Sequence, residues 1–419
     1  MMPEDSIKKY DERIKRINDA IALKEPDCVP CVPQAQVYPY LNAGYTMSEI
    51  MYDVEKAKKS VVKYLNQYEP DMCNGYGSVF AGLGPVMEKI GIKWLQWAGQ
   101  PGSTIDKNSI HQYIEKAYLE EEEYPELLSD VSGWITRRWL PRCFTALEPL
   151  AKMDFRGSLG YGYLPSMMQF ANPELINAFK TMAEVGEMAG QYYMDSAMFE
   201  KEIVKMGFPV QYSAITTTAF DQLSDTLRGT MGTMTDLFEQ PENVKAAVEM
   251  FYPGTLFSAL EQAKHSVGNW VFIPLHKGMD GFMSPTQYDE FYWETLQRLI
   301  NDLIKFGCVP YVYTEGKYDS RLERLRDVPT GKVIYHFEHV DMKEAKRIVG
   351  PHACITGGFN TRLLETGTKE QVIDHTKRLL DICAPGGGYI FDVNDTMDYC
   401  KPENVEAMFD TVKTYGRYK

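Results

Sequence analysis

The sequence predicts an α/β protein, a (β/α)8 barrel of the TIM type with an N-terminal helical elaboration. Short β-rich runs alternate with helix-length segments from residue 208 to residue 395, and the loops between them are short. This alternation is typical of parallel strands joined by crossover helices, and its length favours a closed barrel over an open sheet. The 419 residues contain no repeat and no linker. We therefore expect one domain over residues 1–419, with a helical segment at 1–28 and the barrel at 29–419.

The N-terminal half gives mixed signals. We expect an amphipathic helix over 5–24, a buried strand at 29–36 and a helix over 46–68. A strand that enters a glycine-rich loop is expected at 71–84, and helices are expected over 110–140 and 172–206.

The C-terminal half has the regular alternation. Strands are expected at 208–219, 269–278, 309–316, 332–340, 353–360 and 388–395. Helices are expected between 219 and 265 and over 284–307, 320–328, 341–350, 368–383 and 402–416. The helix over 284–307 has the clearest boundaries, because Ser284 can cap it, Pro285 suits its first turn and Gly307 ends it.

Composition excludes several classes of function. The net charge is −14 and no basic run is present, so binding to nucleic acid or to an anionic membrane is not expected. We find no signal peptide and no apolar run of membrane-spanning length, and we expect a cytoplasmic protein. Cys28 and Cys31 form a C-x2-C pair, but no second pair exists to complete a zinc site. We interpret them as buried thiols.

Candidate catalytic residues stand at the ends of predicted strands. Tyr313 and Glu315 share one face of the strand at 309–316, and His276 lies near the end of the strand at 269–278. Barrel enzymes place their chemistry at the carboxyl ends of the strands. We therefore expect His276, Tyr313 and Glu315 to be catalytic, although a glutamate in this position can also be a structural ion-pair partner.

Metal ligands are expected in the same region. His336 and Glu338 share one face of the strand at 332–340, next along the chain after the strand of Glu315. We expect Glu315, His336 and Glu338 as candidate ligands, most simply for zinc. The alternative for His336 is a histidine of the hydrophobic core with its hydrogen bonds satisfied.

Four segments resemble a known superfamily in their joint order and spacing. These are HKGMDGFMSPTQYDEFYWETLQRLINDLIKFG, VPYVYTEG, ITGGFNTRLLETGTKEQV, and PGGGYIFDVND with KPENVEAM. Together they resemble the uroporphyrinogen decarboxylase superfamily, over residues 205–416 and more weakly over 18–95. The resemblance implies a (β/α)8 barrel.

Departures from the family pattern narrow the function that the resemblance implies. True uroporphyrinogen decarboxylases carry an arginine-rich loop that binds the carboxylates of the substrate, and residues 34–45 here contain no arginine. The branch that methylates coenzyme M carries an H-x-C zinc motif. The corresponding stretch here is Tyr313-Thr314-Glu315, with Asn394 near the position of the late cysteine, so thiolate ligands are missing.

The remaining branch resembles methyltransferase I of O-demethylase systems. Its zinc motif is similar to E-x14-E-x20-H, and Glu315 and His336 match the last two positions while Ile300 stands at the first. The resemblance implies transfer of a methyl group from an aryl methyl ether to the Co(I) corrinoid of a partner protein. Zinc, or a general acid such as His276 or Tyr313, would activate the ether oxygen.

The chain has no D-x-H-x-x-G motif, so the corrinoid is expected on the partner. Five further residues are expected to bind the small aromatic substrate, namely Tyr161, Tyr163, Tyr212, Asp280 and Asn394. A homodimer is also considered. Three alternatives stay open at this point: a lyase that acts on a small carboxylate, a methylcobamide-dependent methyltransferase with another acceptor, and a binding protein that retains the barrel without catalysis.

Overall fold

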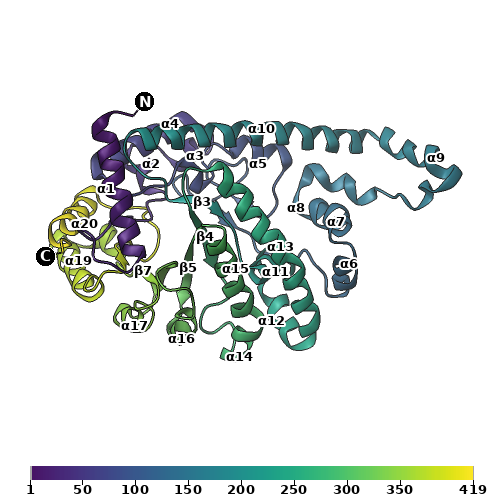
Figure 1. The fold of residues 1–419 in the computed structure, drawn as a ribbon. Coiled ribbons are helices and arrows are strands. Elements are labelled where there is room, and N and C mark those ends of the chain that lie inside the picture. The colour runs from purple at the N-terminus through teal and green to yellow at the C-terminus, as the bar shows by residue number, and fades with distance from the viewer. Residues whose placement is uncertain (1, 419) are drawn as a thin grey trace.

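A computed structural model describes residues 2–418 and contains parallel strands surrounded by helices (Figure 1). Six strands form one parallel sheet in the order β3-β4-β5-β6-β7-β8. Their bounds are Tyr212–Ile215 for β3, Trp270–Leu275 for β4, Val309–Lys317 for β5, Ile334–His339 for β6, Cys354–Gly357 for β7 and Tyr389–Ile390 for β8. All six lie where the sequence predicts strands.

Two short segments close the sheet into a barrel. Their backbone hydrogen bonds run from the amide of Val32 to the carbonyl of Phe391 (2.9 Å), from Asp71 to Cys31 (2.9 Å), and from Gln211 to Cys73 (2.9 Å). The segments around Cys31 and Cys73 therefore stand between β8 and β3 as the first two strands of the ring, and both bridges to the sheet are parallel. The predicted (β/α)8 barrel is confirmed, with its first two strands reduced to a few residues.

Helices cover the barrel and extend beyond it. In the first half of the chain they are α1 (Glu4–Ile21), α2 (Tyr38–Asn42), α3 (Met47–Ile50), α4 (Val54–Tyr68), α5 (Gly84–Ile90), α6 (Tyr124–Ser129), α7 (Val131–Trp134), α8 (Leu140–Cys143), α9 (Tyr163–Met167) and α10 (Pro173–Lys205). In the second half they are α11 (Ala219–Leu223), α12 (Thr230–Glu239), α13 (Pro241–His265), α14 (Pro285–Gln287), α15 (Glu294–Lys305), α16 (Leu322–Leu325), α17 (Met342–Ile348), α18 (Arg362–Thr366), α19 (Lys369–Cys383) and α20 (Pro402–Tyr415).

The prediction of a continuous helix over 110–140 is wrong. Residues 112–113 form strand β2 (Gln112–Tyr113), which pairs with β1 (Leu95–Gln96) as a small antiparallel ladder. The helical part begins only near residue 121 and is broken into short pieces. Pro125 and Gly133 lie within this stretch, and neither residue favours a long regular helix.

Ser284 caps its helix as predicted. Its hydroxyl accepts a hydrogen bond from the amide of Gln287, and the Gln287 side chain bonds back to the Ser284 amide. The helix that follows is not regular, because residues Tyr288–Trp293 form a π-helical turn, η9, between α14 and α15. A π turn widens the helix locally and often occurs at functional sites.

The barrel interior is closed at its amino end by α1. Ile17 and Ile21 of this helix belong to a buried cluster with Trp270 and Tyr311, residues of β4 and β5 that face inward. Arg16 of the same helix forms ion pairs with Asp27 and Asp71 and so ties α1 to the loops below the barrel. The opposite end, where the strands finish, is left for the candidate site.

Helix α10 is the longest element. It runs across one side of the barrel, and its first half projects beyond the body together with α9 (Figure 1). Its bounds agree with the helix predicted over 172–206, and Asn172 caps it by accepting a hydrogen bond from the amide of Glu174. None of the helices over residues 2–418 combines the length and apolar character that crossing a membrane requires.

Candidate active site

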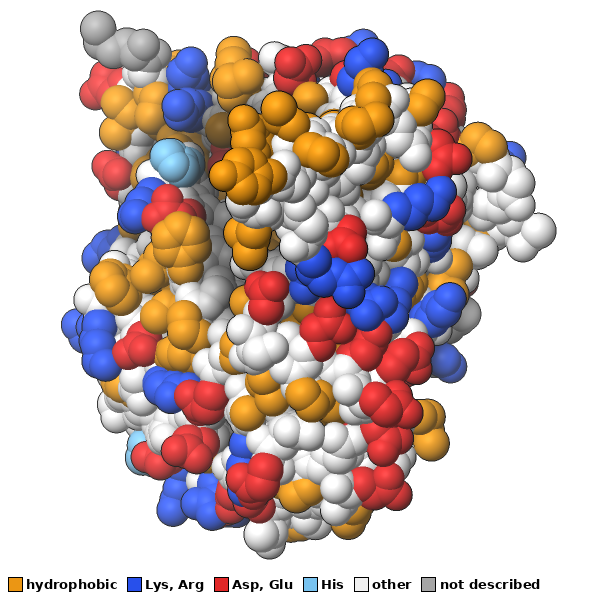
Figure 2. Space-filling model, turned by 90° about the vertical axis from the view of Figure 1, so that its right-hand side faces the viewer, with side chains coloured by type: hydrophobic (Ala, Val, Ile, Leu, Met, Phe, Trp, Pro, Cys, Tyr) orange, Lys and Arg blue, Asp and Glu red, His pale blue; other side chains and the backbone are white. Residues whose placement is uncertain are grey.

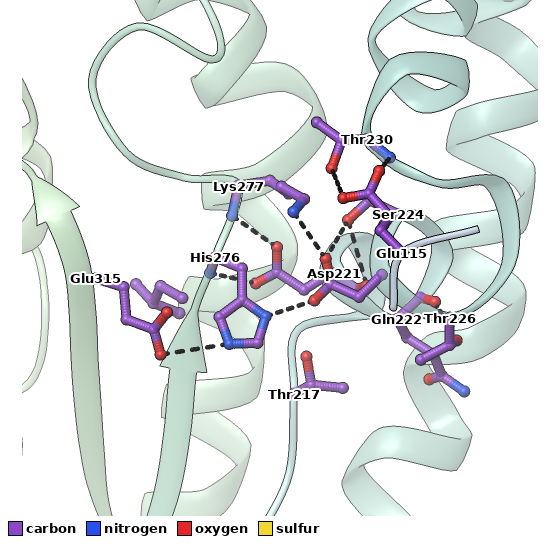
Figure 3. A network of polar contacts seen from close by, with 12 residues as sticks. Glu115, Thr217, Asp221, Gln222, Ser224, Thr226, Thr230, His276, Lys277 and Glu315 are labelled. Atoms are coloured by element: carbon purple, nitrogen blue, oxygen red, sulfur yellow. Dashed lines mark hydrogen bonds and ion pairs between the residues drawn. The ribbon is translucent and has the colours of Figure 1, made fainter. Parts of the chain in front are cut away.

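A histidine between two carboxylates lies at the carboxyl end of the sheet (Figure 3). His276 directly follows β4, and its Nδ1 is 2.5 Å from Oδ2 of Asp225. Its Nε2 is 3.4 Å from Oε1 of Glu315, which lies near the end of the neighbouring strand β5. The two carboxylates therefore contact opposite edges of one imidazole ring. Two of the three residues predicted to be catalytic, His276 and Glu315, are brought together here.

Asp225 lies on a second π-helical turn, η8 (Ser224–Arg228), which follows α11. Lys277 reaches the same carboxylate, with Nζ 3.1 Å from Oδ1 of Asp225. Asp225 thus bridges the imidazole of His276 and the ammonium group of Lys277, and its two oxygens are used by different cations. The side chain of Lys277 is only 13% exposed, so this ion pair is largely sheltered from water.

Asp221 supports the backbone of the site from behind. It is fully buried and accepts hydrogen bonds from the amides of His276 (3.2 Å) and Lys277 (3.0 Å). The hydroxyl of Tyr292 donates a third bond to it at 2.5 Å. Three donors around one buried carboxylate fix the chain at the end of β4, and with it the position of the His276 ring.

The charges of the site depend on one another. Burial alone would disfavour the imidazolium, but hydrogen bonds to Asp225 and Glu315 outweigh it and raise the pKa of His276 to about 11. Burial also opposes ionisation of Asp225, yet the hydrogen bond from His276 and the charge of Lys277 lower the pKa of that carboxyl. At neutral pH the site therefore holds a protonated His276 next to an ionised Asp225.

Asp221 is different from Asp225. Burial, and then repulsion by the charge of Asp225, raise its pKa above the ordinary aspartate value. Two carboxylates four residues apart thus have opposite pKa shifts. Such divergence is typical of sites in which acid and base roles are divided.

Three π-helical turns contribute to the site and its support. The first, η8, carries Asp225 itself, and the second, η9, carries Tyr292. The third, η3 (Ile135–Trp139), carries Trp139, whose Nε1 donates a 3.0 Å hydrogen bond to the carbonyl of Thr226 in η8. Irregular helix geometry is thus concentrated where the site residues are presented.

Two aromatic side chains form a flat surface at the β1–β2 ladder. Tyr113 of β2 stacks on Trp94, which directly precedes β1, with centroids 5.9 Å apart and planes within 6°. Burial, and after it the negative charges of Glu315 and Asp225, raise the pKa of Tyr113. The phenol is therefore within electrostatic range of the two carboxylates that hold His276.

A family model described as uroporphyrinogen decarboxylase (URO-D) matches residues 162–415, more than half of the chain and including His276 and both its carboxylates. The chain belongs to the uroporphyrinogen decarboxylase family. The resemblance found in the sequence is thereby confirmed. No curated protein sequence matches the chain.

Among solved structures, this family member is similar to a methyltransferase from Methanosarcina mazei. The two chains are 14% identical and superpose with a TM-score of 0.59, and the match covers 96% of this chain and 98% of that one. At this level of identity the likeness shows a shared fold over nearly the whole of both chains.

The residues predicted to bind a metal do not converge. His336 is completely buried, and its Nε2 lies 2.9 Å from the carbonyl oxygen of Val393. Glu338 accepts a hydrogen bond from the amide of Gly316, while Glu315 contacts His276 instead. Over residues 2–418, no three His, Cys, Asp or Glu side chains lie close enough together to hold one metal ion. The predicted set of Glu315, His336 and Glu338 is therefore corrected.

His336 instead has the burial of a core histidine, which is part of the alternative left open by the sequence, although its Nδ1 has no hydrogen-bond partner in the described residues. Burial lowers its pKa to about 3, so the ring is neutral at physiological pH. Tyr313 stacks on it with centroids 4.0 Å apart and planes within 9°, and is itself 6% exposed. Tyr313 thus packs inside the barrel below the charged site, and no polar contact joins its hydroxyl to His276 in the described chain.

The five residues predicted to bind substrate also lie apart. Tyr161 and Tyr163 are 102% and 56% exposed on the projecting arm near α9, away from the strands (Figure 1). Tyr212 is hydrogen-bonded to Gln34 inside the barrel. The structure therefore does not bring these three tyrosines together within one chain, because the helical insertion before α10 leaves the barrel.

Asp280 and Asn394 have structural partners in loops. Asp280 accepts hydrogen bonds from the amide and hydroxyl of Ser320, and Asn394 accepts from the amide and hydroxyl of Thr361. Each side chain joins the loop after its own strand to the loop after a neighbouring strand. These are the contacts of loop-capping side chains.

The sequence analysis missed Asp221, Asp225, Lys277, Tyr292 and Tyr113. A usable signal existed for the two aspartates. They stand four residues apart just after the strand predicted at 208–219, so a helix there turns both toward the same side. Lys277 is adjacent to a residue already singled out. Tyr113 had no comparable signal, because its position depends on a ladder within a stretch predicted to be helical.

Proposed function

We propose that this protein transfers a methyl group from an aryl methyl ether to the Co(I) corrinoid of a partner protein, with His276 as the general acid. The observation that carries the proposal is the His276 imidazolium held between Asp225 and Glu315 at the carboxyl end of the strands. The likeness to a structure named as a methyltransferase adds support for methyl transfer within the family.

The proposed reaction transfers one methyl group to cobalt and one proton to the ether oxygen. The bond between the methyl carbon and the ether oxygen breaks, and its electron pair stays on oxygen. A proton from Nε2 of His276 neutralises that oxygen, so a phenol leaves rather than a phenolate. The methyl carbon forms its new bond to cobalt, which changes formally from Co(I) to Co(III). His276 then regains a proton from water, and the protein is unchanged.

Glu315 and Asp225 have different tasks in this proposal. Asp225, at 2.5 Å from Nδ1, orients the ring and stabilises its positive charge throughout. Glu315 makes the looser contact of 3.4 Å with Nε2, and its side chain is 43% exposed. A bound ether oxygen can take the place of Glu315 at Nε2. Loss of the Glu315 carboxylate would lower the pKa of His276 and make its proton easier to transfer.

Zinc is not assigned a step. The predicted ligands face different partners, and the two carboxylates at His276 contact opposite edges of its ring, so neither set can surround one ion with ordinary ligand distances of about 2 Å. Of the two ways of activating the ether oxygen that the sequence left open, the general acid fits the residues present.

The aromatic part of the substrate is proposed to lie against Tyr113 and Trp94. Their stacked rings form a flat apolar surface, and the phenol of Tyr113 is within electrostatic range of Glu315. A surface of this kind suits a methoxylated arene. Residues 34–45 contain no arginine that could bind carboxylates, so a substrate with many carboxylates is not expected.

The proposal is tested by mixing the protein with a reduced corrinoid carrier protein and a panel of methoxyarenes. The expected result is conversion of the Co(I) absorption to that of methyl-Co(III), with release of the matching phenol. His276→Gln should abolish most of the conversion, while His265→Gln, at the exposed end of α13, should not. No conversion with any donor, together with release of CO2 from a small carboxylate, would favour the lyase instead.

A further inference from the structure

A large apolar surface covers the arm that projects from the barrel. Six exposed side chains at the tip of the arm form what we call the arm patch. They are Leu159, Tyr161, Tyr163, Leu164, Met167 and Met168. Their exposed fractions lie between 44% for Met167 and 102% for Tyr161. Figure 2 views the molecule from the end that carries α9, and hydrophobic side chains gather in the upper half of this face.

The arm is anchored and is not a loose tail. Leu175 and Ala178 of α10 are buried against Leu147 and Leu150, and the four form a separate small core at the base of the arm. From this base α10 continues to Lys205 as one helix. The patch is therefore presented on a firm support.

The area of the arm patch matches that of a protein interface. Large apolar side chains bury roughly 150–250 Å² each, so six of them with these exposures leave on the order of 800 Å² uncovered. A standard specific interface buries about 800 Å² on each partner, whereas the largest apolar patch of a monomer is usually about 300–600 Å².

The tip of the arm carries no charged side chain, and several charged side chains beside it form ion pairs. Residues 157–173 contain no charged side chain. At the flanks, Arg156 pairs with Asp154, Lys152 with Glu174, and Lys89 with Glu184. Two copies of a chain with a net charge of −14 repel each other at most orientations. An approach through the two tips brings together surfaces that carry no charged side chain over residues 157–173.

We propose that the arm patch is the contact between two copies of this chain in a symmetric dimer. A two-fold interface joins the same surface on both subunits, so it must be complementary to itself, and an apolar surface without net charge meets this condition. Interfaces that form and dissociate are about as polar as the rest of the surface, whereas permanent contacts between identical subunits are more apolar. The composition of the tip matches the second class.

The test is the mass of the full-length protein in solution, measured by sedimentation velocity and light scattering over a wide range of micromolar concentrations. The expected mass is twice that of the 47.9-kDa chain. The double variant Leu159→Asp with Met168→Asp should sediment as a monomer, with the dissociation constant raised at least about tenfold for each buried charge.

A matched control is available on the body of the molecule. Met231 and Phe238 of α12 are 78% and 77% exposed, and Met231→Asp with Phe238→Asp should leave the dimer intact. The circular dichroism spectrum should be unchanged in both double variants. If the tip variant loses native structure, Tyr161→Arg replaces it, since that side chain is fully exposed and its replacement should not disturb the fold.

Two results would overturn the proposal. The first is a wild-type protein that stays at the mass of one chain at every concentration. The second is a tip variant that still dimerises. A monomeric wild type whose tip variant loses methyl transfer to the carrier protein would instead assign the patch to the carrier, and the dimer would be rejected. The mass measurements test the dimer whether or not the protein uses the proposed methyl donor.

Discussion

Nδ1 of His276 lies 2.5 Å from Oδ2 of Asp225, although 51 positions separate the two residues in the sequence. The contact joins the end of β4 to the π-helical turn that follows α11. Because Nδ1 is committed to this carboxylate, only Nε2, which makes the looser contact with Glu315, remains to meet a substrate. The pair thus determines which atom of the histidine can meet a substrate.

His276→Gln should lower the rate of methyl transfer by about 10²–10⁴, the usual contribution of a positioned general acid. The Gln side chain keeps polar atoms, but it cannot act as an acid because it does not ionise near neutral pH. The donor should still bind, since the aromatic surface of Tyr113 and Trp94 is untouched. Stopped-flow absorption of the cobalt centre measures the rate, and His265→Gln is the control. An unchanged rate would show that another group supplies the proton.

The two carboxylates should contribute unequally to the pKa of His276. Asp225→Asn removes the closer contact and should lower that pKa more than Glu315→Gln, because the distances are 2.5 Å and 3.4 Å. Nitrogen-15 NMR of labelled histidine, followed over a pH titration, reports the ring directly. Glu338→Gln is the control, since Glu338 bonds to Gly316 and should leave the titration of His276 in place. Equal shifts in both variants would contradict the assigned roles.

The protonation of His276 also predicts how stability depends on pH. Its pKa in the folded protein is raised to about 11, above the value of about 6.5 expected when unfolded. A raised pKa stabilises the fold fully below the unfolded pKa, and this contribution is lost as the pH rises through the folded pKa. The stability difference between wild type and His276→Gln should therefore be largest near pH 6 and shrink steadily toward pH 10, by roughly linear linkage.

Urea unfolding at a series of pH values measures this difference. His265→Gln corrects for loss of a histidine as such, because His265 lies at the exposed end of α13. A difference that stays constant with pH would mean that folding does not raise the pKa of His276, and would remove the basis for its role as a protonated acid.

The sequence predicted the barrel because the relevant signals are local. Each of the strands β3 to β8 is a short run of β-forming residues, and Ser284 marks a helix start by its own side chain. The first two strands of the ring lie within the strands predicted at 29–36 and 71–84, although only a few backbone hydrogen bonds near Cys31 and Cys73 define them. The projecting arm could not be predicted. A helical sequence pattern does not indicate whether the helix packs against the barrel or extends away from it.

The site was predicted in part for a similar reason. His276 and Glu315 were found because they end strands, and the barrel fold brings strand ends together. Asp225 stands inside a helical turn, where an aspartate is most often a surface residue. His336 was misjudged because spacing along the chain matches a ligand motif, while its neighbours in space, Tyr313 and Val393, fix it in the core.

Tyr292→Phe should destabilise the fold by about 1–3 kcal/mol, the cost of leaving a buried polar group without its partner. The Tyr292 hydroxyl donates to the fully buried Asp221, and that carboxylate also holds the amides of His276 and Lys277. Tyr288 provides a matched control within the same π turn. It is equally buried, but its hydroxyl has no hydrogen-bond partner in the described structure. Tyr288→Phe should therefore change the free energy of unfolding by much less.

Urea denaturation at neutral pH compares the two variants, and the rate of methyl transfer gives a second reading. Without the Tyr292 hydroxyl, Asp221 holds the end of β4 less firmly, so the His276 ring is less well placed and the maximal rate should fall even at saturating donor. Tyr288→Phe should keep the wild-type rate. If both variants behave alike, Asp221 does not depend on Tyr292, and the backbone of the site is fixed by other contacts.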